Sequence, residues 1–121
     1  MNQKRILLVD DEIALLLMLK RILELAGHEV ATVESGEAAI EHLAGNTVDV
    51  VLTDIAMPGM SGLDLIGHLR GNAVPVSIIA MSGASRDHLT KALELGAYRA
   101  FSKPFDFGEL IRAIESCPSA A

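Results

Sequence analysis

Residues 5–12 read RILLVDDE, an apolar run that ends in three adjacent acids. Apolar residues that follow one another without alternation are typical of a strand buried on both faces of a parallel sheet. Neighbouring carboxylates repel one another, so a fold tolerates them where they face water or a cation. We therefore expect a buried strand over residues 5–9, with Asp10, Asp11 and Glu12 at its end.

The rest of the chain repeats this arrangement of a short apolar run followed by a helical pattern. We expect strands over residues 5–9, 28–33, 48–53, 76–81 and 98–102, and helices over residues 13–26, 37–44, 63–70, 86–95 and 107–116. Glycine or proline closes most of these helices, as is common. Five strand–helix units in succession predict an α/β fold, with a parallel sheet covered by helices on both faces.

The length and hydropathy of the chain indicate one globular domain. Its 121 residues are enough to bury a core, and we expect a single domain over 1–121, ordered over about 4–117 with a short frayed tail. The hydrophobic fraction of 50% and the mean hydropathy of +0.38 exclude a disordered chain. No apolar run approaches the ~20 residues of a membrane helix. The apolar part of the N-terminus is also too short for a signal peptide.

Charge and cysteine content narrow the classes of function. The net charge is −6 and aromatic residues make up 3% of the chain, which argues against nucleic-acid binding by this domain. Cys117 is the single cysteine, so an internal disulfide is excluded and a reducing cytoplasm is expected. The four histidines are scattered without the spacing of metal ligands.

Chemically active side chains follow four of the expected strands. In an open parallel sheet, ligands bind beyond the carboxyl ends of the strands. With the strand order 2-1-3-4-5, the first and third strands are neighbours at ~4.8 Å. That order places Asp54 beside the Asp10–Asp11 pair, and it brings the hydroxyl of Ser82 and the amine of Lys103 to the same edge.

Four segments together resemble a known family. The segments ILLVDDE (6–12), VVLTDIAMPGMSGLDLI (50–66), IIAMSG (78–83) and GAYRAFSKPF (96–105) are similar to the signature segments of response-regulator receiver domains of two-component signalling, of the chemotaxis-receiver type. The resemblance extends over about residues 5–115. It implies a flavodoxin-like, doubly wound, five-stranded parallel sheet of order 2-1-3-4-5, with five helices on two faces.

The resemblance also implies a role for each residue at the edge. Asp54 matches the phosphoacceptor, and a carboxylate is a competent nucleophile for phosphoryl transfer. Ser82 and Lys103 match the residues that bind phosphoryl oxygens. Mg²⁺ or Mn²⁺ is the implied cofactor, since such cations take oxygen ligands. The implied ligands are the carboxylates of Asp10, Asp11 and Asp54, and the backbone carbonyl of Ala56.

Partners follow from the same resemblance. The phosphodonor is expected to be a histidine kinase or a histidine phosphotransfer protein, and the signal is expected to pass to a downstream protein or to an output domain. A weak dimer is possible in such a family, whereas direct contact with nucleic acid or membrane is not expected. The domain is not expected to be an enzyme beyond catalysing its own aspartyl phosphorylation and dephosphorylation.

Three other functions fit these residues less well. A receiver-fold interaction module that works without phosphorylation predicts a missing acid, acceptor or lysine, and none is missing here. A metal-dependent phosphohydrolase commonly has a second Asp two residues after its nucleophile, where this chain has Ala56. A nucleotide-binding enzyme is disfavoured because no glycine-rich phosphate loop follows the first strand. Each of these acids, Ser82 or Lys103 by itself would be an ordinary turn or helix-start residue. Their joint placement at the ends of four strands favours a functional site.

Three further expectations concern packing. The family's aromatic residue three positions before the lysine is replaced by Ala100, so we expect Phe101 in the core and Tyr98 partly covering the face of Ala100. Pro104 matches a position that follows a cis peptide bond. Helical spacing predicts that Leu17 lies on the polar face of the first helix, and that the core face consists of Leu15, Leu19, Ile22 and Ala26.

Overall fold

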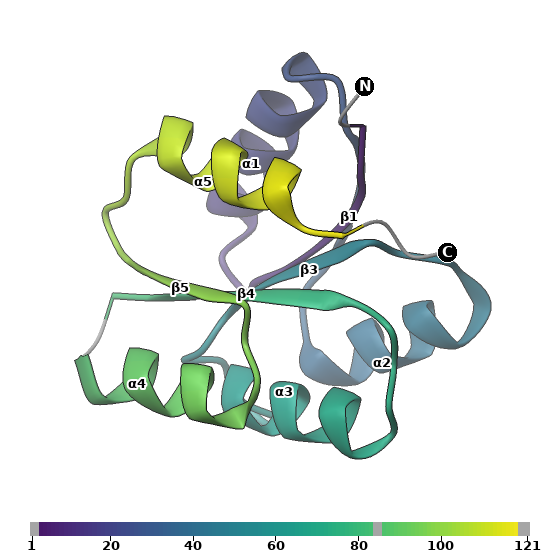
Figure 1. Cartoon of the computed structure of the whole chain (residues 1–121), viewed down its shortest axis with the longest axis vertical. Coiled ribbons are helices and arrows are strands. Elements are labelled where there is room, and N and C mark those ends of the chain that lie inside the picture. The colour runs from purple at the N-terminus through teal and green to yellow at the C-terminus, as the bar shows by residue number, and fades with distance from the viewer. Residues whose placement is uncertain (1–2, 84–85, 119–121) are drawn as a thin grey trace.

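The computed structural model describes residues 3–83 and 86–118. It contains one sheet of five parallel strands in the order β2-β1-β3-β4-β5 (Figure 1). The strands are β1 (Arg5–Val9), β2 (Glu29–Val33), β3 (Val50–Asp54), β4 (Ser77–Ser82) and β5 (Arg99–Ser102). The predicted fold class and strand order are therefore confirmed. Of the tail that is expected to be frayed after about residue 117, residues 119–121 lie outside the described residues.

Five helices cover the two faces of this sheet. They are α1 (Ile13–Leu25), α2 (Gly36–Gly45), α3 (Gly62–Gly71), α4 (Arg86–Leu95) and α5 (Phe107–Ser116). Helices α1 and α5 lie on one face, and α2, α3 and α4 lie on the other (Figure 1). The element boundaries differ from the predicted ones by at most two residues, the usual uncertainty at element ends. None of the helices in the described part of the chain is long and apolar enough to cross a membrane.

The central strands are buried on both faces, as the sequence of β1 predicts. Leu8 of β1 and Leu52 of β3 pack beneath α1 and α5, in one core layer. Leu7 and Val51 point the other way and pack against α2 and α3. These four side chains are fully buried, and each such burial stabilises the fold by roughly 1.5–3 kcal/mol.

The predicted core face of α1 is right in part, since Leu19 is buried and Leu15 and Ile22 are half-buried, but the face is rotated by about one residue. The buried residues are Leu16, Leu19 and Leu23, whereas Ala26 is exposed. The cause is the run of seven apolar residues at 13–19, which gives helical periodicity almost no polar position from which to fix the inward face. The expectation for Leu17 is confirmed, because its side chain is 61% exposed.

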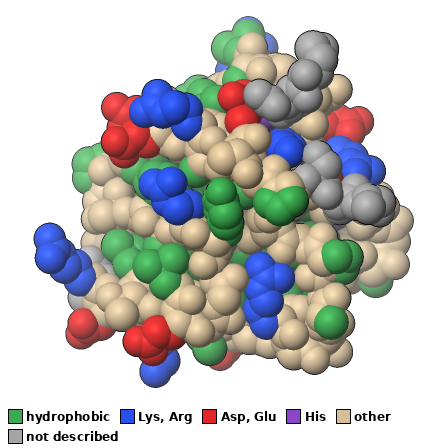
Figure 2. Space-filling view, viewed as in Figure 1, with side chains coloured by type: hydrophobic (Ala, Val, Ile, Leu, Met, Phe, Trp, Pro, Cys, Tyr) green, Lys and Arg blue, Asp and Glu red, His purple; other side chains and the backbone are tan. Residues whose placement is uncertain are grey.

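The end of the sheet near β5 differs from expectation in one contact. Phe101 is buried against the α1–α5 face as predicted, and Ala100 packs on the opposite face. Tyr98 does not cover Ala100, because its hydroxyl oxygen lies 3.0 Å from Ser116 Oγ on α5. Figure 2 shows that the exposed hydrophobic side chains on this side of the molecule are interspersed with charged ones and do not form one continuous apolar surface.

Candidate functional site

Three carboxylates meet at the carboxyl edge of the sheet. Asp10 follows β1 and is 1% exposed, and Asp54 ends β3 and is 6% exposed. Asp11 lies at the exposed start of the loop after β1. One oxygen atom from each of these three side chains lies within 4.8 Å of the others. A backbone N–H orients the innermost acid, since Glu12 donates to Asp10 Oδ1 at 2.9 Å.

Lys103 reaches this acidic cluster from the loop after β5. Its Nζ lies 3.1 Å from Asp54 Oδ1 and 3.3 Å from Asp10 Oδ2, so one ammonium is shared between two carboxylates. The Lys103 backbone N–H donates to the carbonyl of Ser82 at 2.8 Å, which joins the carboxyl ends of β4 and β5. The Lys103–Pro104 peptide bond is cis, as expected.

The electrostatics of the site follow from burial and from this pairing. Burial raises the pKa of Asp54, the charges of Asp10 and Asp11 raise it further, and the hydrogen bond from Lys103 opposes both. Burial alone would lower the pKa of Lys103, but its hydrogen bond with Asp54 and the charge of Asp10 outweigh burial and raise it. Lys103 is therefore held as an ammonium beside the carboxylates.

The other two predicted site residues lie at the same edge. Ser82 is the last residue of β4 and is 1% exposed, and its neighbour Met81 pairs with Asp54 across the sheet. Ala56 is exposed two residues after Asp54, in the loop that leads to α3. The structure thus brings all the predicted residues to the ends of adjacent strands, while their functional roles stay predictions.

Sequence reasoning missed two residues that hold the backbone of Asp54. The Thr53 hydroxyl donates to the Asp54 carbonyl oxygen at 2.9 Å within the core. Gly62 begins α3 and donates its N–H to the Ile55 carbonyl at 2.8 Å. A Cβ at Gly62 would collide with the Asp54 carbonyl oxygen and lie 2.7 Å from Ile55 Cα, so only glycine fits. The signal in the sequence is the segment MPGMSG (57–62), whose last residue is this glycine.

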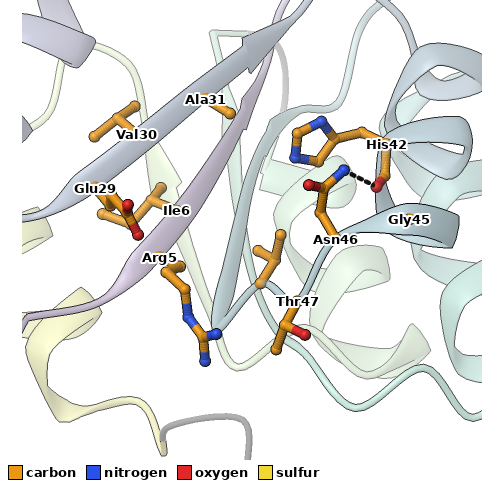
Figure 3. Close-up of a pocket in the computed structure, with 10 residues that line it drawn as sticks. Arg5, Ile6, Glu29, Val30, Ala31, His42, Gly45, Asn46 and Thr47 are labelled. Carbon is orange, nitrogen blue, oxygen red and sulfur yellow. Dashed lines mark hydrogen bonds between the residues drawn. The ribbon is translucent and has the colours of Figure 1, made fainter.

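A hollow at the opposite edge of the sheet does not contain this chemistry. It has a volume of ≈ 480 Å³ and lies at the amino ends of β1 and β2, beside the end of α2 (Figure 3). Asn46 closes the end of α2 by donating to the His42 carbonyl at 2.9 Å. None of the predicted site residues lines this hollow, so its size does not make it the candidate site.

The carboxyl-edge cluster suits a divalent cation. All three side-chain donors are carboxylate oxygens, which is the donor type that Mg²⁺ and Mn²⁺ prefer. The ammonium of Lys103 offsets one of the three negative charges, so the cluster retains an excess of negative charge that a small divalent cation can neutralise. A cluster of this composition at the ends of parallel strands, with a lysine over the central acid, is typical of phosphoryl-group chemistry on a carboxylate.

The comparison with protein families assigns the class of protein. The model of the response regulator receiver domain matches residues 6–115, and the chain belongs to this family. The chain is 37% identical over 108 residues to the DNA-binding transcriptional regulator NtrC of Escherichia coli (strain K12), covering 88% of this chain and 23% of NtrC. It is 34% identical over 112 residues to the transcriptional regulatory protein KdpE of Mycobacterium tuberculosis (strain ATCC 25618 / H37Rv), covering 92% of this chain and 49% of KdpE. The chain thus spans about half the length, or less, of these curated relatives.

Solved structures agree with this assignment. The structure of FixJ-N superposes with a TM-score of 0.91 and 26% identity, covering 100% of both chains. The response regulator TrrA from Thermotoga maritima, solved in complex with Mg²⁺-BeF, superposes with a TM-score of 0.83 and 36% identity, covering 93% of this chain and 97% of TrrA. The predicted family and fold are therefore confirmed.

Proposed function

We propose that this domain is a phosphorylation-dependent signalling switch in which Asp54 accepts the phosphoryl group. The observation that carries the proposal is the placement of Asp54 among Asp10, Asp11 and Lys103, with the ammonium 3.1 Å from Asp54 Oδ1. The donor is a phosphorylated histidine of a histidine kinase or of a histidine phosphotransfer protein. Both act in the cytoplasm, where the single thiol of this chain stays reduced.

The transfer is a displacement at phosphorus. An Asp54 carboxylate oxygen forms a bond to phosphorus while the phosphorus–nitrogen bond of the donor breaks, and the imidazole leaves with that electron pair. The product is an acyl phosphate, which water later hydrolyses to restore the carboxylate and release inorganic phosphate. Lys103 and the Ser82 hydroxyl donate hydrogen bonds to phosphoryl oxygens, so catalysis consists of positioning and charge neutralisation. The domain therefore modifies itself and turns over no separate substrate.

A divalent cation completes this chemistry when bound, by neutralising charge between the carboxylates and the phosphoryl oxygens. Asp10, Asp11, Asp54 and the backbone carbonyl of Ala56 would hold Mg²⁺ or Mn²⁺. The Mg²⁺-BeF complex of the related TrrA supports the same choice of ion. The signal then passes to a downstream protein or to an attached output domain, as the names of the longer relatives suggest.

Intact mass after incubation with acetyl phosphate and Mg²⁺ tests the proposal. The wild-type chain should gain one phosphoryl group, and chelation of the metal should prevent it. Asp54→Asn should stay unlabelled, whereas Asp87→Asn, the same change at an exposed acid of α4, should be labelled as the wild type is. Full labelling of the Asp54→Asn protein would refute the assignment of the acceptor.

A further inference from the structure

A buried polar cluster lies at the amino edge of the sheet, where the proposed phosphoryl chemistry does not use it. We call His28, Lys4, Glu115 and Cys117 the amino-edge cluster. His28 is 5% exposed, Lys4 6% and Cys117 2%, so three of its members are buried. They come from the residue before β1, the residue before β2 and the end of α5, segments that are far apart in sequence.

The hydrogen bonds of His28 fix its tautomer. The backbone N–H of Lys4 lies 3.0 Å from Nδ1, and because a backbone amide can only donate, Nδ1 must carry a lone pair. Nε2 lies 3.1 Å from Glu115 Oε2, a carboxylate oxygen that accepts, so Nε2 carries the hydrogen. The neutral ring satisfies both partners, and a further proton can enter only at Nδ1.

The same residues hold the end of α5 against the sheet. Lys4 Nζ donates to the Cys117 carbonyl at 2.6 Å, just past the last turn of α5. The Lys4 carbonyl accepts from the Glu29 N–H at 3.0 Å, which pairs the starts of β1 and β2. Displacing Lys4 from His28 therefore disturbs both the β1–β2 pairing and the attachment of α5.

We propose that His28 is a proton-sensitive clasp for the C-terminal end of α5. A proton on Nδ1 turns the acceptor of the Lys4 N–H into a second donor, so the buried contact between the ring and Lys4 is lost. The charged groups of the segments around the ring would act on a charged imidazole in opposite directions. The Lys4 ammonium repels the charged ring, and Glu115 attracts it from α5. Glu29 lies beside Lys4 at the start of β2, and the Arg5–Asp49 pair, 3.2 Å apart, is nearly neutral at the start of β1.

Acid should consequently separate His28 and Lys4 while Glu115 keeps hold of the ring. Because Lys4 also holds the Cys117 carbonyl, the last turn of α5 should loosen. The acidic cluster around Asp54 lies at the other edge of the sheet, so this response goes beyond the proposed phosphorylation and does not depend on it.

Cys117 provides a built-in reporter of this loosening, because it is the single cysteine and is buried. Its rate of reaction with 4,4′-dithiodipyridine, a reagent that also reacts with thiols in acid, is compared with that of a free cysteine peptide at each pH. The ratio of the two rates gives the protection of Cys117. Measurements at about pH 7.5 and about pH 5.5 compare slightly basic with mildly acidic conditions, the range over which histidine side chains act as pH switches.

The wild-type protection should fall by about tenfold over this range, the size expected when one buried donor loses its partner. His28→Gln keeps a donor and an acceptor but does not titrate, so its protection should stay constant. His68→Gln, at an exposed position of α3, should behave as the wild type does. Constant protection in the wild type, or an equal fall in His28→Gln, would overturn the proposal. If His28→Gln fails to fold, ¹⁵N spectra of the wild-type ring decide, because an Nδ1 that stays unprotonated at pH 5.5 overturns it as well.

Discussion

Two glycines of α3 should respond in opposite directions to the same substitution. Gly67 is exposed and a Cβ there would meet nothing within 4 Å, so Gly67→Ala should raise the free energy of unfolding by ~0.5–1 kcal/mol, since alanine loses less entropy in a helix. At Gly62 the added carbon would lie 2.7 Å from Ile55 Cα and collide with the Asp54 carbonyl oxygen. Carbon atoms in contact rest at ~3.5–4.0 Å, so the backbone must move by about 1 Å. Overpacking of this kind costs ~1–3 kcal/mol.

Urea unfolding of the two variants measures this difference, which should be roughly 1.5–4 kcal/mol between Gly67→Ala and Gly62→Ala. Equal slopes of the free energy against urea would show that both variants unfold from equally compact states. The free energy of unfolding of the wild type should lie between those of the two variants. A Gly62→Ala protein at least as stable as the wild type would refute the argument that α3 begins in contact with the Asp54 backbone.

Three other predictions concern the metal, the charge and the core. Asp11→Ala should weaken Mg²⁺ binding more than Asp10→Ala in isothermal titration, because Asp10 is already held by Lys103 and a backbone N–H; equal losses would contradict this. Asp54→Asn should raise the free energy of unfolding at neutral pH without metal, because burial raises the pKa of Asp54 and its charged form therefore destabilises the fold. This gain in the free energy of unfolding should shrink as the pH falls through the raised pKa of Asp54 toward the ordinary value near ~3.9. Urea unfolding at several pH values measures the gain, and a gain that is absent or that grows as the pH falls would contradict the argument. Leu23→Ala should lower the free energy of unfolding by ~2–5 kcal/mol, whereas Leu17→Ala should lower it by less than ~0.5 kcal/mol. Similar losses for both variants in urea unfolding would contradict the observed inward face of α1.

The fold and the location of the site were predictable because their signals are local. An apolar run such as residues 5–9 marks a strand wherever it occurs, and in a parallel sheet the residues that follow the strands meet at one edge. The inward face of α1 was predictable only in part, because its run of seven apolar residues leaves the rotation of the helix about its axis open. The contacts of Gly62 with Asp54 and of His28 with Glu115 were also beyond reach. The first depends on how the loop between β3 and α3 folds back on Asp54, and the second joins residues 87 apart in sequence, so both depend on how the elements pack.

The small side chain of Ala100 limits how strongly β5 can report on the site. Two conformations differ in population only as far as their contacts differ in free energy, and ~1.4 kcal/mol corresponds to a factor of ten. Moving one methyl group between buried and exposed positions is worth about 0.8 kcal/mol, or roughly a fourfold change in population. An aromatic ring at the same position would be worth ~1.5–3 kcal/mol, which corresponds to roughly ten- to hundredfold. Most of the amplitude of any switching in this domain must therefore come from segments other than position 100, and the hydrogen bond between Lys103 and Ser82 links the ends of β4 and β5 beside the site.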